Sequence, residues 1–366
     1  MAKVRLGRTG IITEQNAFGA LPIQRISFEA AGKLLNRALD GGMTFIDTAR
    51  AYTDSEEKIG ASIAHRRQEY ALASKTMAKT PEGFWQDLHT SLRNLKTDCI
   101  DIYQFHCVDR CYRPGDGTDM YECMEEAKKQ GKIRHISITA HKIGVAEEIV
   151  ESGLYDTLQF PFCYLATDRD IALVNRCKEK DVGFIAMKAL SGGLITNSAA
   201  AYAYIAQFEN PLPIWGIQRE SELDEFLAYM KNPPTMTEEI TALIEKDRTE
   251  LLGDFCRGCG YCMPCPAGIE INNCARMAQL IRRSPSAGWL SEEAQAKMEK
   301  IAGCLHCNKC MQHCPYHLNI PELLAKNLED YRRIVRGEVT VEGEDVSLLS
   351  QKRNRKPVLV LLIGCV

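Results

Sequence analysis

Eight short apolar segments alternate with longer amphipathic segments along much of the chain. The short segments are rich in apolar and β-branched residues, as strands are, and the longer ones have helical spacing, several opened by Ser, Thr or Asp at the N-cap position. Strands are predicted at residues 15–19, 44–47, 70–75, 100–106, 135–139, 157–160, 183–187 and 213–216. Helices are predicted between them, among others at residues 28–40, 82–95, 120–130, 169–180 and 220–230. Eight strand–helix units in series are typical of an α/β fold, the closed (β/α)8 or TIM barrel.

An open doubly wound sheet is the alternative to a barrel. No Gly-x-Gly-x-x-Gly turn follows the first predicted strand, which argues against a dinucleotide-binding sheet of that kind. The opening segment 4–12, with Gly7 and Gly10 as turn residues, is predicted to form a hairpin that covers the bottom of the barrel.

The length of 366 residues and a hydrophobic content of 45% suit a barrel with an appended domain. The paired prolines Pro233 and Pro234 indicate a boundary, and a helical connector over 237–252 follows them. We therefore predict a barrel over 1–235, a second domain over 236–336 and a poorly ordered tail over 337–366, where periodicity is lost.

Composition excludes several classes of function. A net charge of -3, with 25% charged residues of both signs, provides no basic stripe for nucleic acid. The N-terminus lacks an apolar signal core, and the apolar run 358–366 is shorter than the roughly 20 residues that span a bilayer. We expect a soluble, cytoplasmic protein that binds neither nucleic acid nor membrane, and whose 16 cysteines are reduced.

Half of these cysteines form two runs after the predicted barrel. The first run has C-x2-C-x2-C-x2-C spacing and the second C-x2-C-x2-C-x3-C spacing, and a proline follows each. The eight residues are Cys256, Cys259, Cys262, Cys265, Cys304, Cys307, Cys310 and Cys314. Three cysteines so spaced can wrap one face of a cuboidal iron–sulfur cluster while a fourth comes from elsewhere. Two [4Fe–4S] clusters are therefore predicted, with structural zinc on the Cys pairs as the alternative.

In ferredoxins the fourth cysteine of each run serves the other cluster. That rule assigns Cys314 to the first three cysteines of the first run, and Cys265 to the first three of the second run. The shorter spacing before Cys265 leaves this partition open. Helices predicted at 271–283, 291–301 and 320–335 make the domain resemble an α-helical ferredoxin domain.

Four polar residues stand at or just after the ends of consecutive predicted strands: Asp47, Tyr52, Lys75 and His106. A single such residue is usually a loop residue, but catalytic groups of a (β/α)8 barrel lie at these strand ends, and these four are chemically complementary. An ammonium near a tyrosine lowers the pKa of its hydroxyl, a carboxylate holds the ammonium in place, and an imidazole can orient a carbonyl oxygen.

The segments 45–52, 74–76 and 104–106 resemble the catalytic segments of the aldo/keto reductases, and the resemblance covers roughly residues 1–230. The whole chain, with its cysteine run at 256–266, resembles a subfamily that carries a C-terminal [4Fe–4S] domain.

By this resemblance Tyr52 is the proton donor, Lys75 the residue that tunes its pKa, Asp47 the partner of Lys75, and His106 the residue that orients the substrate. The implied reaction is hydride transfer between a nicotinamide, NADP or NAD, and a small carbonyl or hydroxy compound.

The resemblance also implies a nicotinamide site. Its candidate residues are Thr139, Gln159, Met187, Leu190, Ser191, Gly192, Gly193, Gly216 and Arg219. Three positions depart from the family pattern: Ala140 follows Thr139 where Ser-Asn is usual, Met187 replaces a stacking aromatic ring, and Phe226 replaces an asparagine that contacts adenine. Arg219 could pair with a 2′-phosphate. His141, Cys163, Tyr164 and Trp215 are further candidates for lining the pocket.

Three functions are consistent with these features. The first is a reductase that couples nicotinamide chemistry to electron transfer through two clusters, with a flavin in the barrel or a redox protein partner converting hydride into single electrons. The second is a cluster-fed reductase that no longer binds nicotinamide. The third is an electron-transfer protein whose barrel serves only for docking.

Overall fold

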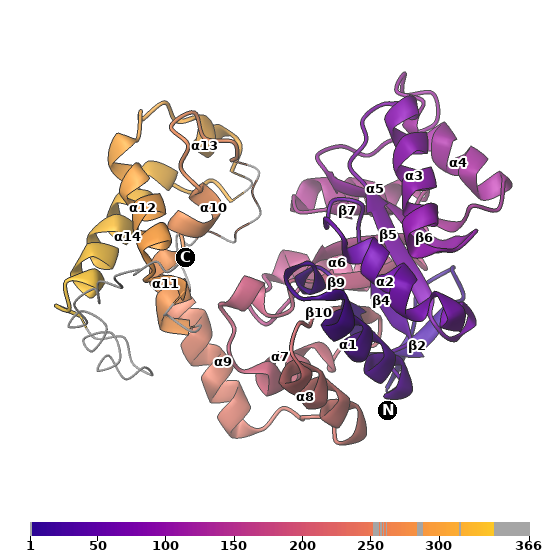
Figure 1. Ribbon diagram of the computed structural model, residues 1–366, viewed down its shortest axis with the longest axis horizontal. Helices are drawn as coiled ribbons and strands as arrows, with labels where there is room; N and C mark the ends of the chain where they lie inside the picture. The colour runs from indigo at the N-terminus through magenta and orange to yellow at the C-terminus, as the bar shows by residue number, and fades with distance from the viewer. Residues whose placement is uncertain are drawn as a thin grey trace, which may run out of the picture. The chain divides into compact units, whose positions relative to one another are not determined.

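The computed structural model describes residues 2–251, 256, 258, 260, 262–283, 288–314 and 316–339. The chain divides into two compact units, Met1–Cys259 and Gly260–Val366, each of which is treated by itself (Figure 1). The predicted tail lies, from residue 340 onward, outside the described residues. Among the described residues, no helix is both long and apolar enough to cross a membrane.

The first unit is the predicted closed barrel of eight parallel strands, which pair in the order β10-β3-β4-β5-β6-β7-β8-β9. Its strands are β3 (Ala17–Gly19), β4 (Phe45–Asp47), β5 (Ala71–Thr76), β6 (Ile100–Val108), β7 (Ile133–Ala140), β8 (Thr157–Pro161), β9 (Gly183–Met187) and β10 (Pro211–Gly216). Each falls on a predicted segment, with ends that differ by three residues at most. The fold prediction is confirmed.

Helices surround the strands (Figure 1). They are α1 (Phe28–Asp40), α2 (Ser55–Ile63), α3 (Pro81–Leu95), α4 (Met120–Lys129), α5 (Ile143–Ser152), α6 (Asp168–Glu179), α7 (Ser198–Ile205) and α8 (Glu220–Lys231). The side chains of Ser27, Thr80 and Thr167 cap α1, α3 and α6 by accepting backbone N–H groups. The helices α2, α5 and α7 were not individually predicted. Helix α7 lacks an apolar stripe because nearly every one of its side chains is buried.

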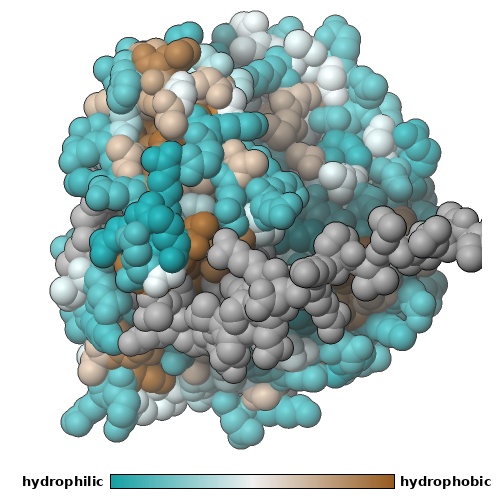
Figure 2. Space-filling model, turned by 60° about the vertical axis from the view of Figure 1, so that its left-hand side comes forward, coloured by the Kyte–Doolittle hydropathy of each residue, from teal (hydrophilic) through white to brown (hydrophobic). Residues whose placement is uncertain are grey.

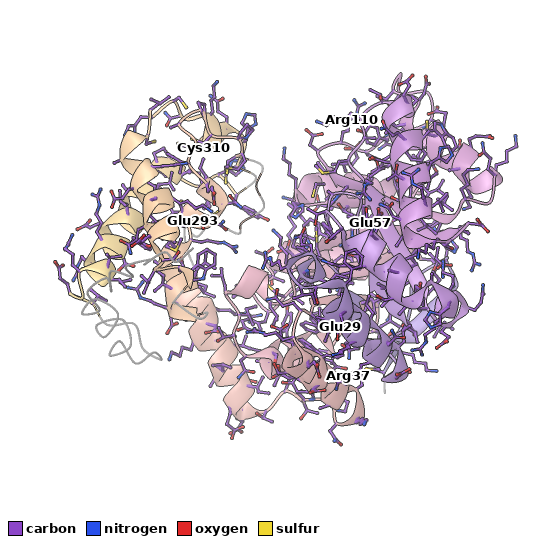
Figure 3. All side chains as sticks on the ribbon, viewed as in Figure 1. Glu29, Arg37, Glu57, Arg110, Glu293 and Cys310 are labelled. Carbon is purple, nitrogen blue, oxygen red and sulfur yellow. The ribbon has the colours of Figure 1, made fainter. Side chains whose placement is uncertain are left out.

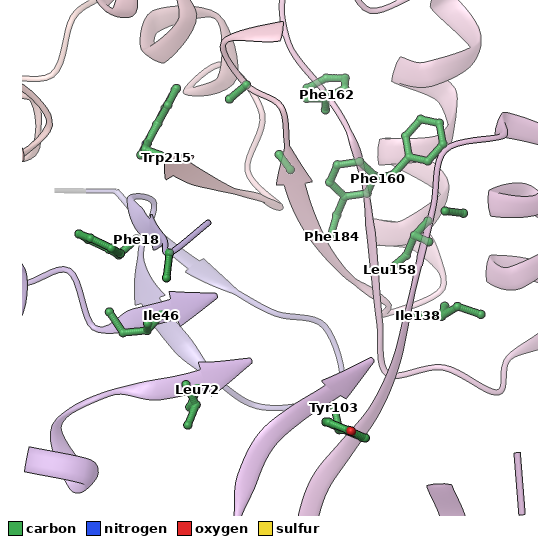
Figure 4. Close-up of a cluster of buried hydrophobic side chains, with 14 of the residues drawn as sticks. Phe18, Ile46, Leu72, Tyr103, Ile138, Leu158, Phe160, Phe162, Phe184 and Trp215 are labelled. Atoms are coloured by element: carbon green, nitrogen blue, oxygen red, sulfur yellow. The ribbon is translucent and has the colours of Figure 1, made fainter. Parts of the chain in front are cut away.

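The strands alternate their side chains between two hydrophobic clusters. Phe45, Ile102 and Ile185 point into the barrel and form a small cluster. Neighbouring side chains such as Phe18, Ile46, Leu72, Tyr103 and Phe184 belong to the larger cluster that the helices cover (Figure 4). Both faces of every strand are therefore buried, which explains why the strands read as apolar runs in the sequence.

The predicted hairpin closes one end of the barrel. Strands β1 (Lys3–Arg5) and β2 (Ile12–Glu14) pair antiparallel, and Val4 and Leu6 complete the small interior cluster. Gly7 has a φ of +49°, and a Cβ there would lie 2.4 Å from the backbone nitrogen of Gly183. Only glycine permits this close approach of the hairpin to the sheet. The opposite end of the barrel is left for a functional site.

Helix α9 (Glu238–Leu251) belongs to the barrel unit. Arg248 Nε donates to the carbonyl oxygen of Tyr164 at 2.7 Å, and the Tyr164 hydroxyl hydrogen-bonds to the carboxylate of Asp247. The sequence placed the boundary after residue 235, whereas compactness divides the chain after Cys259. The residues between the two boundaries include this helix, which these polar contacts attach to the barrel.

The second unit is helical, as predicted. It contains α10 (Ile271–Cys274), α11 (Met277–Arg283), α12 (Glu292–Glu299), a 3-10 turn (Lys300–Gly303), α13 (Lys309–Gln312) and α14 (Ile320–Val335). The predicted helix over 271–283 is interrupted. At the break, buried Asn327 of α14 accepts the N–H of Ala278 at 2.8 Å and donates to the carbonyl oxygen of Ala275 at 3.3 Å. The amide side chain thus satisfies the backbone groups that the break exposes.

Hydrophilic residues cover most of the coloured surface in the view of Figure 2, and hydrophobic side chains show there in separate patches.

Candidate active site and cysteine pocket

The four predicted catalytic residues lie together at the open end of the barrel. Asp47 ends β4, Lys75 and His106 lie near the ends of β5 and β6, and Tyr52 is in the loop after β4. Lys75 Nζ lies 2.6 Å from Asp47 Oδ2 and donates to the carbonyl oxygen of Thr48 at 2.7 Å. Lys75 and Asp47 are 0% and 2% exposed, so the ion pair is fully buried.

Tyr52 lies above this ion pair. Lys75 Nζ is 5.3 Å from the centre of the Tyr52 ring, and the rings of Tyr52 and His106 meet edge to face at 5.7 Å. The sequence predicted that these four residues lie at one end of the barrel. In the structure their side chains also lie next to one another.

Two glutamines extend the site in a way that the sequence analysis missed. Gln104 Nε2 donates to Asp47 Oδ1 at 3.3 Å and to Gln159 Oε1 at 2.9 Å. Ser137 Oγ donates to Gln104 Oε1 at 3.3 Å. All three side chains are buried. Gln159, predicted to hold a carboxamide, therefore uses its own carbonyl oxygen inside this network. Gln104 stands two residues before His106 on the same predicted strand, so its side chain was expected on the same face as that of His106, and this was the available signal.

The protonation of the site follows from burial. Burial raises the pKa of Tyr52 well above its ordinary value, and Asp47 and Cys107 add to the rise. The sequence led us to expect a lowering by Lys75, and the effect of burial is opposite in sign. Burial also raises the pKa of Asp47, against the opposing charge of Lys75. The Tyr52 hydroxyl consequently stays protonated at neutral pH.

His106 is kept neutral. Burial and then the charge of Lys75 lower its pKa to about 3. Its Nδ1 atom is buried and has no hydrogen-bond partner among the residues that the structure describes. His141 follows β7, is 5% exposed, and has a pKa lowered to about 3 by burial, Lys188 and His106. The imidazole of His106 is thus uncharged beside Tyr52 and Lys75, and that of His141 is uncharged in the surroundings of His106 and Lys188.

These histidines make stability depend on pH. In the unfolded chain they take up protons below about pH 6.5, while in the folded chain they stay neutral down to about pH 3. Stability should therefore fall as the pH falls through this window. We expect the wild type to lose about 2 kcal/mol more than the His106→Gln variant between pH 7 and pH 5, measured by urea unfolding of the barrel.

The matched control is His89→Gln, because His89 is exposed on α3. That variant should lose as much stability as the wild type does on acidification. An equal loss in His106→Gln would show that His106 is not a buried neutral base in the folded protein.

The predicted nicotinamide residues are less uniformly placed. Thr139 is buried at the end of β7, and its hydroxyl accepts the N–H of Cys107 at 2.7 Å. Ala140 is fully buried and offers no polar side chain. Met187 ends β9 and is half-buried. Ala140 thus lacks the amide side chain, and Met187 the aromatic ring, that the family pattern has at these two positions.

The predicted phosphate loop is a short turn with two glycines in the left-handed region. Leu190 precedes a short 3-10 turn, Ser191–Gly193, in which Gly192 and Gly193 have φ of +66° and +93°. Both glycines are exposed, and a Cβ on Gly193 would meet no atom within 4 Å. Backbone N–H groups in such a turn can approach an anion closely.

In the region predicted to bind the adenosine phosphate, Arg219 and Phe226 already contact other side chains of the chain. Gly216 ends β10 and is exposed. Arg219 Nη2 lies 2.5 Å from Glu222 Oε1, so a 2′-phosphate would compete with this pair. Phe226 is buried and stacks on Trp215 with ring centres 4.4 Å apart. Trp215 and Tyr164, which were candidates for lining the pocket, are 1% and 0% exposed and belong to the core.

Five of the predicted cluster ligands surround a single pocket in the second unit. They are Cys262, Cys265, Cys304, Cys307 and Cys310, and the last is labelled in Figure 3. Apolar residues including Ile269, Ile271 and Leu324 complete the lining. Two cysteine runs that are separated along the chain thus line one pocket, and thiolates are the donors that a [4Fe–4S] cluster needs. Among the described residues, however, no three His, Cys, Asp or Glu side chains lie close enough together to hold a single metal ion.

The other three predicted ligands are placed as follows. Cys256 and Cys314 are buried, and the N–H of Gly258 points to Cys256 Sγ at 3.4 Å. Cys259 lies outside the described residues. An N–H group directed at a sulfur is a common feature around iron–sulfur ligands.

Family comparisons agree with both parts of the chain. Residues 15–200 match the aldo/keto reductase family, and residues 255–319 match a 4Fe-4S dicluster domain. The second match supports iron–sulfur clusters over the structural zinc that the spacing also allowed.

Curated relatives resemble the barrel part. The chain is 29% identical over 208 residues to the aldo-keto reductase str7 of Strobilurus tenacellus, which covers 50% of this chain and 60% of that protein. It is 30% identical over 176 residues to the aldo-keto reductase YhdN of Bacillus subtilis, which covers 44% of this chain and 52% of that protein. The alignments thus span only about half of these relatives' length or slightly more.

Solved structures show the same fold. An aldo-keto reductase from Klebsiella pneumoniae in complex with NADPH has a TM-score of 0.57 and 21% identity, covering 67% of this chain and 94% of that chain. The holo form of an aldo-keto reductase from Bacillus halodurans has a TM-score of 0.58 and 19% identity, covering 68% of this chain and 96% of that chain. With the family match over half of its length, the chain belongs to the aldo/keto reductase family of oxidoreductases and carries a 4Fe-4S domain after the barrel.

Proposed function

We propose that the barrel reduces the carbonyl group of a small molecule to an alcohol, or catalyses the reverse reaction, with Tyr52 as the proton donor. The observation that carries this proposal is the buried ion pair of Lys75 and Asp47 beneath the Tyr52 ring. A buried ion pair costs desolvation energy, and its place next to a protonated phenol is best explained by proton transfer at that phenol.

In this proposal the side chains act on the carbonyl oxygen. The neutral imidazole of His106 and the hydroxyl of Tyr52 hold the oxygen by hydrogen bonds. As the carbon takes up two electrons, the Tyr52 hydroxyl passes its proton to the oxygen, and the positive charge of Lys75 stabilises the phenolate that remains. Asp47, held by Gln104, keeps Lys75 in place. Solvent then returns a proton to Tyr52.

When bound, a nicotinamide would supply a hydride, and each cluster a single electron. The glycine loop at 191–193 supports nucleotide binding, as does the NADPH bound in the relative from Klebsiella pneumoniae. NADP is proposed over NAD because Arg219 can bind a 2′-phosphate. The phosphate would have to displace Glu222, which pairs with Arg219.

We further propose two [4Fe–4S] clusters on the eight cysteines of the two runs. Cys265 would join Cys304, Cys307 and Cys310, since all four line one pocket. Cys256, Cys259, Cys262 and Cys314 would hold the other cluster. A flavin in the barrel or a redox protein partner would convert between a hydride and single electrons. The reduced thiols that such clusters need support a cytoplasmic location.

One specific observation favours a second candidate. Ala140 is buried and Met187 carries no ring, so the usual contacts to a nicotinamide are missing at two positions. The barrel could then receive two electrons singly from the clusters, with Tyr52 supplying the proton to the oxygen and solvent the proton to the carbon. The remaining alternative is an electron-transfer protein whose barrel serves only to dock a partner. In that protein Tyr52 would have no chemical role.

The two candidates separate in one titration. Protein is purified without oxygen, its iron and sulfide are measured, and NADPH or NADH is added while the visible absorbance of the clusters is followed. We expect NADPH to bleach the absorbance of the clusters, because the proposed enzyme passes electrons from NADPH to the clusters. A full complement of clusters without bleaching, and without a change in tryptophan fluorescence, would favour the cluster-fed reductase.

A further inference from the structure

Glu56 is a fully buried carboxylate that the proposed chemistry does not use. It is the second residue of α2, and it is 0% exposed. One of its oxygens accepts the hydroxyl of Ser74 at 2.6 Å. The other oxygen pairs with the guanidinium of Arg50. A buried carboxylate is costly to desolvate, so these two bonds must offset that cost.

The two partners of Glu56 lie next to the two residues at the centre of the site. Ser74 directly precedes Lys75 on β5, and Arg50 lies two residues before Tyr52 in the loop. The N–H of Arg50 also donates to the carbonyl oxygen of Lys75 at 3.0 Å. One carboxylate therefore joins the strand that carries Lys75 to the loop that carries Tyr52.

The backbone of this loop needs such support. Thr53, immediately after Tyr52, has a φ of +41°, a conformation that is strained for a β-branched residue. Arg50 Nη2 donates to the carbonyl oxygen of Thr53 at 3.2 Å. One nitrogen of the Arg50 guanidinium thus binds the strained residue Thr53, and the other binds Glu56. Strain of this kind persists only where the surroundings hold it.

We propose that Glu56 is a positioning residue that holds the Tyr52 loop in register with the Lys75 strand. It acts through Arg50 on the loop and through Ser74 on the strand, and it touches neither substrate nor cofactor. Without it, the segment 49–54 relaxes and the Tyr52 ring leaves its place beside Lys75 and His106. The inference rests on the proposed role of Tyr52.

The test compares Glu56→Gln with Glu57→Gln. Glutamine keeps the shape and an oxygen for Ser74 but removes the charge that Arg50 binds. Glu57 is the next residue on α2, is exposed, and is labelled in Figure 3. The first measurement is amide hydrogen exchange of the segment 48–55, which needs neither substrate nor cofactor. Faster exchange there in Glu56→Gln, with wild-type exchange in Glu57→Gln, is expected.

The second measurement is NADPH-dependent reduction of an activated aromatic aldehyde such as 4-nitrobenzaldehyde. A misplaced proton donor affects the chemical step more than binding, so we expect kcat to fall about tenfold in Glu56→Gln with KM within about twofold. The pH dependence of kcat should also shift, because the surroundings of the Tyr52 hydroxyl change. Glu57→Gln should match the wild type in all three respects.

The outcomes separate the two proposals. Unchanged exchange of 48–55 in Glu56→Gln overturns the positioning role, and so does faster exchange with unchanged kcat. A wild type without aldehyde reduction overturns the proposed function, and hydrogen exchange then decides alone whether Glu56 orders the loop. If Glu56→Gln does not fold, Ser74→Ala, which removes only the hydroxyl, must show the faster exchange in its place.

Discussion

Replacing Tyr52 by phenylalanine is expected to lower kcat for aldehyde reduction by about 10³-fold, since general acid catalysis by a positioned side chain contributes about 10²- to 10⁴-fold. The variant loses one oxygen atom and keeps the ring that lies 5.3 Å from Lys75 Nζ. The ring contact with His106 should also survive. The loss should therefore appear in kcat, measured as oxidation of NADPH that depends on the aldehyde, and much less in KM.

Two controls give this experiment its meaning. Iron content and the reduction of the clusters by dithionite should be the same in Tyr52→Phe and the wild type, because Tyr52 is not one of the eight proposed cluster ligands. Tyr202→Phe removes a hydroxyl from a ring that stacks on Trp215 in the core, and it should leave kcat unchanged. Full aldehyde turnover in Tyr52→Phe would remove the phenol from the mechanism.

Replacing Cys265 by alanine is expected to remove one of the two proposed clusters, so that iron and acid-labile sulfide fall by about half. The physical reason is that Cys265 is the residue of the first run that we assign to the pocket of Cys304, Cys307 and Cys310. A cuboidal cluster deprived of one thiolate is exposed to solvent at that corner. Because ligand binding and folding are coupled, the second unit should also unfold at a lower temperature.

The matched control is Cys274→Ala. Cys274 is a buried thiol of the same unit, outside both runs, and its sulfur lies 3.9 Å from the carbonyl oxygen of Lys297. That variant should keep its full iron content. Cys262 also lines the pocket, so Cys262→Ala decides the partition: we expect it to remove the other cluster, seen as a different remaining electron paramagnetic resonance signal. Identical signals in Cys262→Ala and Cys265→Ala would overturn the proposed partition.

The parts of the fold that could be predicted share one physical property. Parallel strands buried on both faces leave runs of apolar residues, and eight such runs identified the barrel. Helix α14 was predicted with its observed bounds because its apolar stripe is regular. Helix α7 was missed because it is buried on all sides, and the helix over 271–283 was predicted unbroken because Asn327, far along the chain, supplies the bonds at the break.

The candidate site divides in the same way. Asp47, Lys75 and His106 could be found because strand ends of a barrel meet at one rim, whatever the details of packing. The bonds between Gln104 and Gln159 could not, because they join strands that are distant in sequence. The direction in which the pKa of Tyr52 shifts was also not predictable. A motif shows that a charged residue lies near the hydroxyl, but it does not show how deeply the hydroxyl is buried.

The sequence by itself determined the barrel, the helical domain and the residue types at the rim and in the cysteine runs, because these depend on local periodicity and spacing. Only the tertiary structure decided which polar groups lose their water. Glu56 and Glu57 are identical neighbours in the sequence, yet the first is fully buried between two segments of the site and the second is exposed. That difference arises from contacts of α2 with β5 and the Tyr52 loop, and desolvation by distant parts of the chain leaves no mark on local sequence.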